Sequence, residues 1–173
     1  ACHSQLKNGA QPVSASAVAI TNDTTHTGSG KVAYEVPRAL TDEEVPGVVA
    51  GFRKAAENAK DAGFDGVVIH GANGYLLDQF LRDGCNQRIG PYGGSIAKRG
   101  RLLLEVVEAV TDVWGADRVG VRLSPLSSFN SMHESDPVAL TTWLAQSFNP
   151  MHLAYIHLIR GDVLGNLEGD VLT

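Results

Sequence analysis

Residues 45–70 read VPGVVAGFRKAAENAKDAGFDGVVIH, and this stretch joins two different patterns of apolar residues. In its first part apolar residues recur at roughly helical spacing, and Gly63 is suited to end a helix. The residues just upstream, TDEE from Thr41, predict the cap of this helix, with Pro46 near its start. The closing FDGVVIH is short, β-branched and apolar, which predicts a strand buried on both faces.

The same order of helix and strand occurs twice more. SIAKRGRLLLEVVEAVTDVWG (95–115) predicts a helix and RVGVRLSP (118–125) a strand; SDPVALTTWLAQSF (135–148) and LAYIHLI (153–159) predict the next pair. Short connections between alternating helices and strands favour parallel strands with right-handed helical crossovers. Both a doubly wound sheet and a (β/α)8 barrel have this pattern.

Polar side chains gather at the C-terminal end of each predicted strand. They are His70 with Asn73 and Tyr75, Arg122 with Ser124, and His157 with Arg160 and Asp162. This clustering is typical of a barrel, which binds ligands at the C-terminal mouth of its strands. A doubly wound sheet usually carries a glycine-rich phosphate loop after its first strand, and neither GxGxxG nor GxxxxGK[ST] occurs in this sequence. The pattern therefore favours the barrel.

Size and composition set the domain organisation. With 173 residues, 43% of them hydrophobic, the chain can bury one ordinary core, so we expect a single domain over residues 1–173. Within it, residues 41–173 would form the βα units. Residues 1–40 carry turn residues throughout but little sustained periodicity, and we expect them to form a long loop. The GSG at 28–30 follows no predicted strand and is interpreted as a flexible turn.

The charge of the chain bears on its partners. Nineteen acidic and fourteen basic residues give a net charge of −5, and the basic residues form no run, which disfavours a nucleic-acid groove or an anionic membrane surface as partner. A small molecule is the expected partner. Cys2 and Cys85 match no zinc or thioredoxin spacing, and no segment has the profile of a membrane span or a signal peptide. These features favour a reducing cytoplasm.

The polar residues at the strand ends also have ordinary structural explanations. Taken alone, a histidine at a strand end is more often structural than catalytic, Asn73 and Gly74 can be only a turn, and Tyr75 can be a half-buried aromatic residue. Arg122 is the stronger candidate, because an arginine in an apolar strand is costly unless something pairs with it.

Several other residues are interpreted as follows. Arg88 and Arg99 are expected to pair with carboxylates or carbonyls near the YGGS turn, and His157 and Arg160 are candidates for the barrel mouth. Trp114 and Trp143 are expected to pack the helices against the barrel. The remaining histidines lack the spacing of a metal site and are expected at surface or loop positions; they are His3, His26, His133 and His152.

The motifs HGANGYLLDQFL (70–81), NQRIGPYGGSIAKRGRLLLEVVEAV (86–110) and VGVRLSP (119–125) together resemble the old yellow enzyme family of FMN-dependent ene-reductases. The resemblance extends upstream to NGAQPVSASA and PRALTDEEV and downstream to IRGD, so it spans essentially the whole chain. Two positions depart from the family, which commonly has an acid in place of Gly90 and an asparagine in place of Lys98. The resemblance implies a partial (β/α)8 TIM barrel that comprises about strands four to six of eight.

The resemblance also implies a reaction and a role for each site residue. The family reduces the C=C bond of α,β-unsaturated carbonyl or nitro compounds, with NADPH or NADH as the hydride source. His70 and Asn73 would donate hydrogen bonds to the substrate carbonyl, where preoriented donors stabilise the developing enolate charge. Tyr75 would protonate the α-carbon as general acid, and Arg122 would lie against the flavin, where its cation favours negative charge on the reduced ring.

The resemblance places part of the FMN site outside this chain. Three strands would precede Ala1 and two would follow Thr173, and the latter carry the loops that hold the FMN phosphate. The chain is therefore expected to be an internal fragment of a barrel. A catalytically inactive truncated barrel, or an interaction module, is the alternative interpretation, and assembly into a homo-oligomer stays open.

Overall fold

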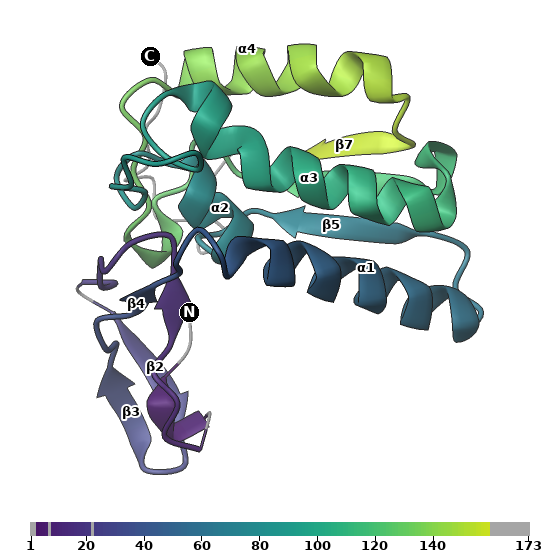
Figure 1. The fold of residues 1–173 in the computed structure, drawn as a ribbon. Helices are drawn as coiled ribbons and strands as arrows, with labels where there is room; N and C mark the ends of the chain where they lie inside the picture. Colours follow the sequence, from purple (N-terminus) through teal and green to yellow (C-terminus); the bar gives the residue numbers. More distant parts are fainter. Residues whose placement is uncertain (1–2, 7, 22, 160–173) are drawn as a thin grey trace.

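The computed structural model describes residues 3–6, 8–21 and 23–159. Figure 1 shows a layer of helices packed against a parallel sheet, from which an N-terminal β-hairpin projects as an arm. The principal elements in chain order are α1 (Val45–Asp61), β5 (Val67–Gly71), α2 (Leu76–Leu81), α3 (Ile96–Trp114), β6 (Val119–Leu123), α4 (Pro137–Phe148) and β7 (Tyr155–Leu158).

The sheet confirms the predicted parallel arrangement. Its strand order is β5-β6-β7, and both pairs of neighbouring strands are parallel. Helix α3 lies in the connection between β5 and β6, and helix α4 lies in the connection between β6 and β7, so each crossover contains a helix. The three predicted helix–strand units are therefore present within one or two residues of the predicted bounds, except that α1 begins four residues after Thr41 and β5 begins three residues after Phe64.

Burial differs between the two faces of the sheet. Ile69 and Val121 are at most 3% exposed and belong to the core that α1, α3 and α4 share with the sheet. On the opposite face Val68 is 47% and Tyr155 is 50% exposed. The prediction that the first strand is buried on both faces is therefore wrong for this structure, because no element among the described residues covers that second face.

The helices pack on one another through the two tryptophans. The Trp114 indole on α3 donates a hydrogen bond to the carbonyl of Ala56 on α1 at 3.0 Å. The Trp143 ring on α4 covers Gly100 on α3, where an added Cβ would lie 2.1 Å from the ring. These side chains join neighbouring helices, and both pack against the hydrophobic core that includes Ile69 and Val121 of the sheet, which agrees with the packing role that the sequence predicted.

The start of α1 differs from the predicted cap. The helix begins at Val45, and the side chain of Glu44 accepts a hydrogen bond from the Thr41 amide at 2.8 Å while it pairs with Arg38 at 2.7 Å. TDEE therefore forms a turn before the helix rather than its first residues. The predicted stop is confirmed, since Gly63 follows the helix end with a φ of +83°.

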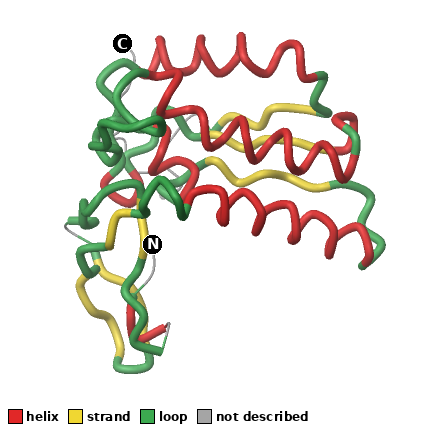
Figure 2. Tube along the Cα trace, viewed as in Figure 1, coloured by secondary structure: helices red, strands yellow, loops and turns green. Residues whose placement is uncertain are grey.

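Residues 1–40 contain more regular structure than the expected long loop. Strands β2 (Thr24–Thr27) and β3 (Gly30–Ala33) form an antiparallel hairpin, and β1 (Val13–Ser14) pairs in parallel with β4 (Arg38–Ala39). The GSG is the turn of this hairpin, with Gly30 at φ +99°. Polar strands of four residues carry too little hydrophobic alternation to be predicted. Figure 2 shows the hairpin extending away from the helical layer.

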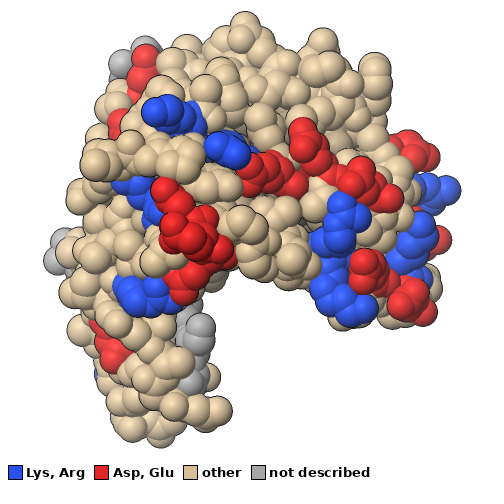
Figure 3. Space-filling model, in the orientation of Figure 1, with Lys and Arg blue, Asp and Glu red and all other residues tan. Residues whose placement is uncertain are grey.

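Charged side chains are mixed on the surface. On the face in Figure 3, Lys and Arg side chains are interspersed with Asp and Glu. One exposed ion pair, Arg53 with Asp112 at 2.6 Å, joins α1 to α3, and exposed pairs of this kind contribute at most about 1 kcal/mol. In the part of the chain that the structure describes, the helices are too short or too polar to traverse a bilayer.

Candidate active site

Three polar residues form a row across the sheet. His70 on β5 pairs in register with Arg122 on β6, and Arg122 pairs in register with His157 on β7. Because side chains alternate between the faces of a strand, and Ile69 and Val121 face the helices, this row lies on the opposite, open face. The structure thus brings together polar groups from three strand ends, as the sequence predicted. Arg160 and Asp162 lie outside the described residues.

The surroundings of His70 keep its ring neutral. Burial lowers the pKa of His70 below its ordinary value, and the positive charge of Arg122 lowers this pKa further. A neutral imidazole donates through one nitrogen and accepts through the other. His70 therefore offers one N–H to an acceptor near neutral pH.

Tyr75 and Asn73 follow His70 in the loop between β5 and α2. The rings of His70 and Tyr75 have centroids 5.4 Å apart and are inclined at 54°, and Tyr75 is 41% exposed. Asn73 adopts the left-handed conformation with φ +59°, and its Oδ1 is buried without a hydrogen-bond partner. The end of β5 and the loop after it therefore present an imidazole, an amide and a phenol within six residues.

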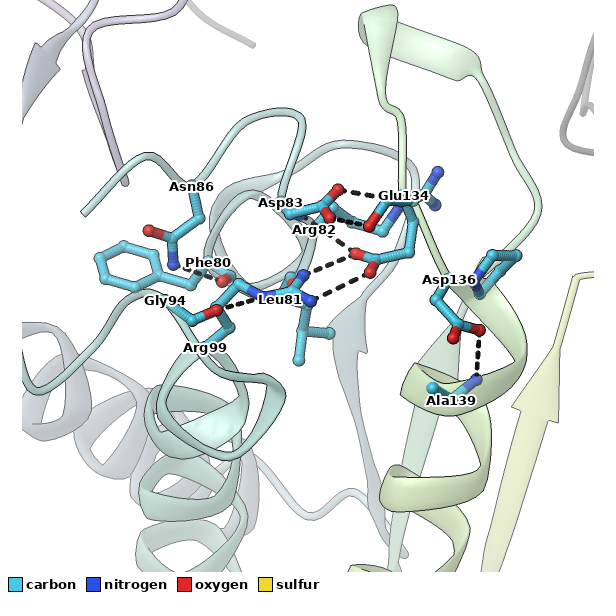
Figure 4. A network of polar contacts seen from close by, with 12 residues as sticks. Phe80, Leu81, Arg82, Asp83, Asn86, Gly94, Arg99, Glu134, Asp136 and Ala139 are labelled. Carbon is cyan, nitrogen blue, oxygen red and sulfur yellow. Dashed lines mark hydrogen bonds and ion pairs between the residues drawn. The ribbon is translucent and has the colours of Figure 1, made fainter. Parts of the chain in front are cut away.

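The proposed site residues differ from the structural arginines in their hydrogen bonding. Within the described residues, no hydrogen bond engages the side chains of His70, Asn73, Tyr75 or Arg122, and the Nε of Arg122 is buried without a partner. In contrast, Arg99 donates to both carboxylate oxygens of buried Glu134, at 2.6 and 3.0 Å (Figure 4). Polar groups left unpaired at one place on the sheet are available to a ligand.

The structural role predicted for Arg88 and Arg99 is confirmed. Arg88 donates to the carbonyl of Ala15 at 2.9 Å and pairs with Asp42, and Arg99 donates to the carbonyl of Gly94 at 3.2 Å. Gly90 also adjoins this cluster, because a Cβ there would lie 2.8 Å from Asp42 Oδ2. An acidic side chain at that position would crowd the Asp42 carboxylate, which pairs with Arg88.

One of the histidines assigned to surface or loop positions, His3, is buried. His3 is only 7% exposed and lies 3.7 Å from the carboxylate of Glu35, so it occupies a loop position, as predicted, but not a surface one. Among the described residues, no group of three His, Cys, Asp or Glu side chains is arranged to hold a metal ion. Cys85 is buried and forms no disulfide, and burial raises the pKa of its thiol.

A buried carboxyl group behind the loop was not predicted. Asp78, in the first turn of α2, is 2% exposed, and burial raises its pKa to about 6. It accepts a hydrogen bond from the Gly74 amide at 2.8 Å. Helix α2 has only six residues, too few for the periodicity that would have placed Asp78 on its inner side.

A cavity of about 290 Å³ adjoins Tyr75 on the side of the N-terminal segment. Its wall is mostly apolar, and Ile20, Leu76 and Met132 contribute to it. Tyr34 also lines the cavity, and its pKa is raised mainly by burial, with Tyr75 among the nearby groups that raise it further. The cavity gives Tyr75 a neighbouring space that an apolar substituent of a ligand could occupy.

Comparison with known proteins shows extensive similarity. The profile of the NADH:flavin oxidoreductase / NADH oxidase family matches residues 1–167. A probable flavin mononucleotide-dependent alkene reductase of Leishmania infantum is 44% identical over 173 residues, which cover 96% of this chain and 47% of that protein. The 12-oxophytodienoate reductase 1 of Oryza sativa subsp. japonica is 47% identical over 155 residues, covering 88% and 39%.

Solved structures show the same similarity in three dimensions. Morphinone reductase superposes with a TM-score of 0.90 at 38% identity, over 96% of this chain and 46% of that one. The old yellow enzyme from Trypanosoma cruzi gives 0.86 at 44% identity, over 94% and 45%. The chain spans about half the length of the curated relatives that it matches.

Proposed function

The chain belongs to the NADH:flavin oxidoreductase / NADH oxidase family, and from this premise we propose that it carries the substrate-activating part of an FMN-dependent ene-reductase. Its three βα units form part of a (β/α)8 barrel of the old yellow enzyme type. The proposed reaction is reduction of the C=C bond of an α,β-unsaturated carbonyl or nitro compound with NADPH or NADH. The observation that carries the proposal is the set of unpaired polar side chains on the open face of the sheet.

The residues present fit one side of an FMN site. Arg122 is a permanent cation on the open face, its Nε is buried without a partner, and it lies beside His70 in register. Such a group suits the pyrimidine edge of a flavin, on which negative charge develops during reduction. Reduced FMN, when bound, supplies the hydride. The residues that hold its phosphate are expected outside this chain.

His70 and Asn73 are proposed to bind the substrate oxygen. The neutral ring of His70 has one N–H to donate, and the side-chain amide of Asn73 makes no hydrogen bond to the described part of the chain. As the alkene is reduced, negative charge develops on the carbonyl or nitro oxygen. Donors oriented before the reaction stabilise this charge more than they stabilise the neutral ground state.

Tyr75 is proposed to supply the proton. Its ring lies beside that of His70 and is 41% exposed, so its hydroxyl can face a substrate bound at the two donors. As general acid, its phenol can deliver a proton to the α-carbon as that carbon gains electron density.

Partner and compartment follow from the same proposal. The partner is a small electron-poor alkene, and the cavity beside Tyr75 accommodates an apolar substituent. A cytoplasmic location agrees with the buried free thiol of Cys85. The alternative, an inactive partial barrel or interaction module, is favoured only by the exposed apolar residues of the open face, such as Val68 and Tyr155.

The test uses a polypeptide that contains residues 1–173 together with the other strands of the barrel, with FMN bound. We call it the FMN-loaded protein. Its visible spectrum should show the absorption of bound oxidised flavin. In the absence of oxygen, NADPH or NADH should reduce the flavin and bleach this absorption. Addition of 2-cyclohexenone should then reoxidise the flavin and restore the absorption. A colourless protein, or a reduced one that the enone does not reoxidise, contradicts the proposal and supports the inactive alternative.

A further inference from the structure

The loop after β5 is held by side chains. All four backbone polar groups of Asn73 and Gly74 bond to side chains rather than to other backbone groups. The bonds are Asn73 N–H to Ser124 Oγ (2.7 Å), Asn130 Nδ2 to Asn73 O (2.7 Å), Gly74 N–H to Asp78 Oδ2 (2.8 Å) and Gln79 Nε2 to Gly74 O (2.8 Å). We call Ser124, Asn130, Asp78 and Gln79 the peptide clamp.

The clamp engages a turn whose two central residues are left-handed, a conformation that asparagine and glycine adopt more readily than other residues. Asn73 and Gly74 have φ angles of +59° and +68°, in the left-handed region. Two successive residues in this region leave their peptide groups outside any helix or sheet ladder, so other partners must satisfy them. The Tyr75 amide donates to the Ala72 carbonyl at 3.3 Å and closes the turn, and side chains supply the partners of the four peptide groups inside it. The direction in which the loop leaves β5 therefore depends on these side-chain contacts as well as on the turn itself.

The loop after β6 also packs directly on this turn. A Cβ at Gly74 would lie 2.7 Å from Asn130 Cβ and 2.8 Å from Met132 Cγ. Asn130 itself has a φ of +60° within the 3-10 turn Phe129–Ser131. The two loops therefore fit together only with glycine at position 74. They are distant in sequence, since Asn73 is 51 residues from Ser124 and 57 residues from Asn130.

Ser124 connects the clamp to two neighbouring elements. Its hydroxyl accepts from the Asn73 amide, and its Oγ lies 3.4 Å from Asp78 Oδ2, to which it can donate. It is also two residues beyond Arg122 at the end of β6. The strand that carries the proposed flavin contact therefore also holds the loop that carries the proposed substrate donors.

We propose that the peptide clamp positions Asn73 and Tyr75 relative to His70 and Arg122, so that donor, proton source and flavin contact keep one geometry. The four clamp residues act through the peptide groups of residues 73 and 74, and two of them, Gln79 and Asn130, also line the cavity beside Tyr75. The chemistry that they serve is the ene-reduction proposed above, on which this inference rests.

The first test measures the clamp without any reaction. Ser124→Ala removes the acceptor of the Asn73 amide, so hydrogen exchange at that amide, followed by NMR in the FMN-loaded protein, should accelerate about tenfold. Amides of β6 should keep their protection. Ser124→Thr retains the hydroxyl and should restore slow exchange, and Ser147→Ala, whose hydroxyl bonds within α4, is the matched control.

The second test measures ligand geometry. The binding of phenol to the FMN-loaded protein is measured by its long-wavelength charge-transfer band. Ser124→Ala and Gln79→Glu should each weaken this binding by about tenfold, whereas the flavin content should stay unchanged. Gln146→Glu on the exposed side of α4 is the control for the second variant. Gln79→Glu cannot donate to the Gly74 carbonyl, so it tests the clamp even where Ser124→Ala fails to fold.

The outcomes separate the two proposals. Unchanged Asn73 exchange in Ser124→Ala overturns the clamp, and so does accelerated exchange with undiminished phenol affinity. An unmodified FMN-loaded protein without a charge-transfer band contradicts the proposed function instead, since that result does not depend on any clamp variant.

Discussion

His70 and Arg122 occupy the same register position on the neighbouring parallel strands β5 and β6. Their proximity gives the open face of the sheet a neutral imidazole beside a permanent cation, because burial and then the charge of Arg122 lower the pKa of His70. This arrangement supplies an uncharged hydrogen-bond donor next to a positive charge. Both features suit a site where negative charge develops on a ligand.

This relationship predicts a change in the titration of His70. Arg122→Leu removes the cation, so the pKa of His70 should rise toward its ordinary value, while burial still holds it somewhat lower. NMR titration of the His70 ring measures the midpoint. Arg53→Leu removes an exposed charge from α1 and should leave it unchanged. A midpoint equal in the Arg122 variant and the unmodified protein would show that the two side chains do not interact.

Tyr75→Phe should separate the two halves of the proposed reaction. The phenol acts only as the proton donor to the substrate, so reduction of the flavin by NADPH or NADH should stay nearly intact. Enone reduction should slow, since general acid catalysis contributes about 10²–10⁴-fold. Stopped-flow traces of the FMN-loaded protein resolve both steps, and equal slowing of the two would refute the role of Tyr75.

Removal of both proposed donors should weaken phenolic ligands. The double variant His70→Ala with Asn73→Gly keeps the left-handed turn, because glycine adopts the φ of +59° without strain. Each lost charge-assisted hydrogen bond should cost about 1.5–3 kcal/mol of binding, whereas flavin content should change little. Titration with phenol checks this. Undiminished affinity in the double variant would exclude these residues from the oxyanion site.

Gly100→Ala should destabilise the protein through α4. The new methyl group would meet the Trp143 ring at 2.1 Å, and overpacking of this kind costs about 1–3 kcal/mol. Gly51→Ala in α1 is the control, because a Cβ there meets no atom within 4 Å and alanine favours the helix. Urea unfolding of both variants should move the midpoints in opposite directions. A Gly100 variant as stable as the unmodified protein would mean that Trp143 is free to move aside.

Residues 1–173, purified by themselves, should self-associate and bind FMN poorly. The open face exposes Val68 and Tyr155, and β5 and β7 are both edge strands of the three-stranded sheet. Exposed strand edges and apolar residues favour aggregation. Gel filtration with a visible spectrum, in the presence of excess FMN, measures both properties. A monodisperse yellow monomer would contradict this prediction, because it would show that the open face of the sheet is stable in water and that residues 1–173 suffice to bind the flavin.

Local patterns in the sequence determined the elements of the helical layer. The periodicity of residues 45–61 and the β-branched run at 67–69 depend only on neighbours along the chain, so α1 and β5 could be predicted from them. The placement of His70 and Arg122 at strand ends followed in the same way. The sequence motifs also determined the family, since several of them occur in order.

The tertiary structure alone decided how the site is held. Ser124 and Asn130 reach Asn73 from the loop after β6, and Trp143 covers Gly100 from another helix. The exposure of Val68 depends on which elements lie across the sheet, not on its own strand. Such contacts join residues far apart in sequence, and no local periodicity or propensity encodes which distant side chain will satisfy a given peptide group.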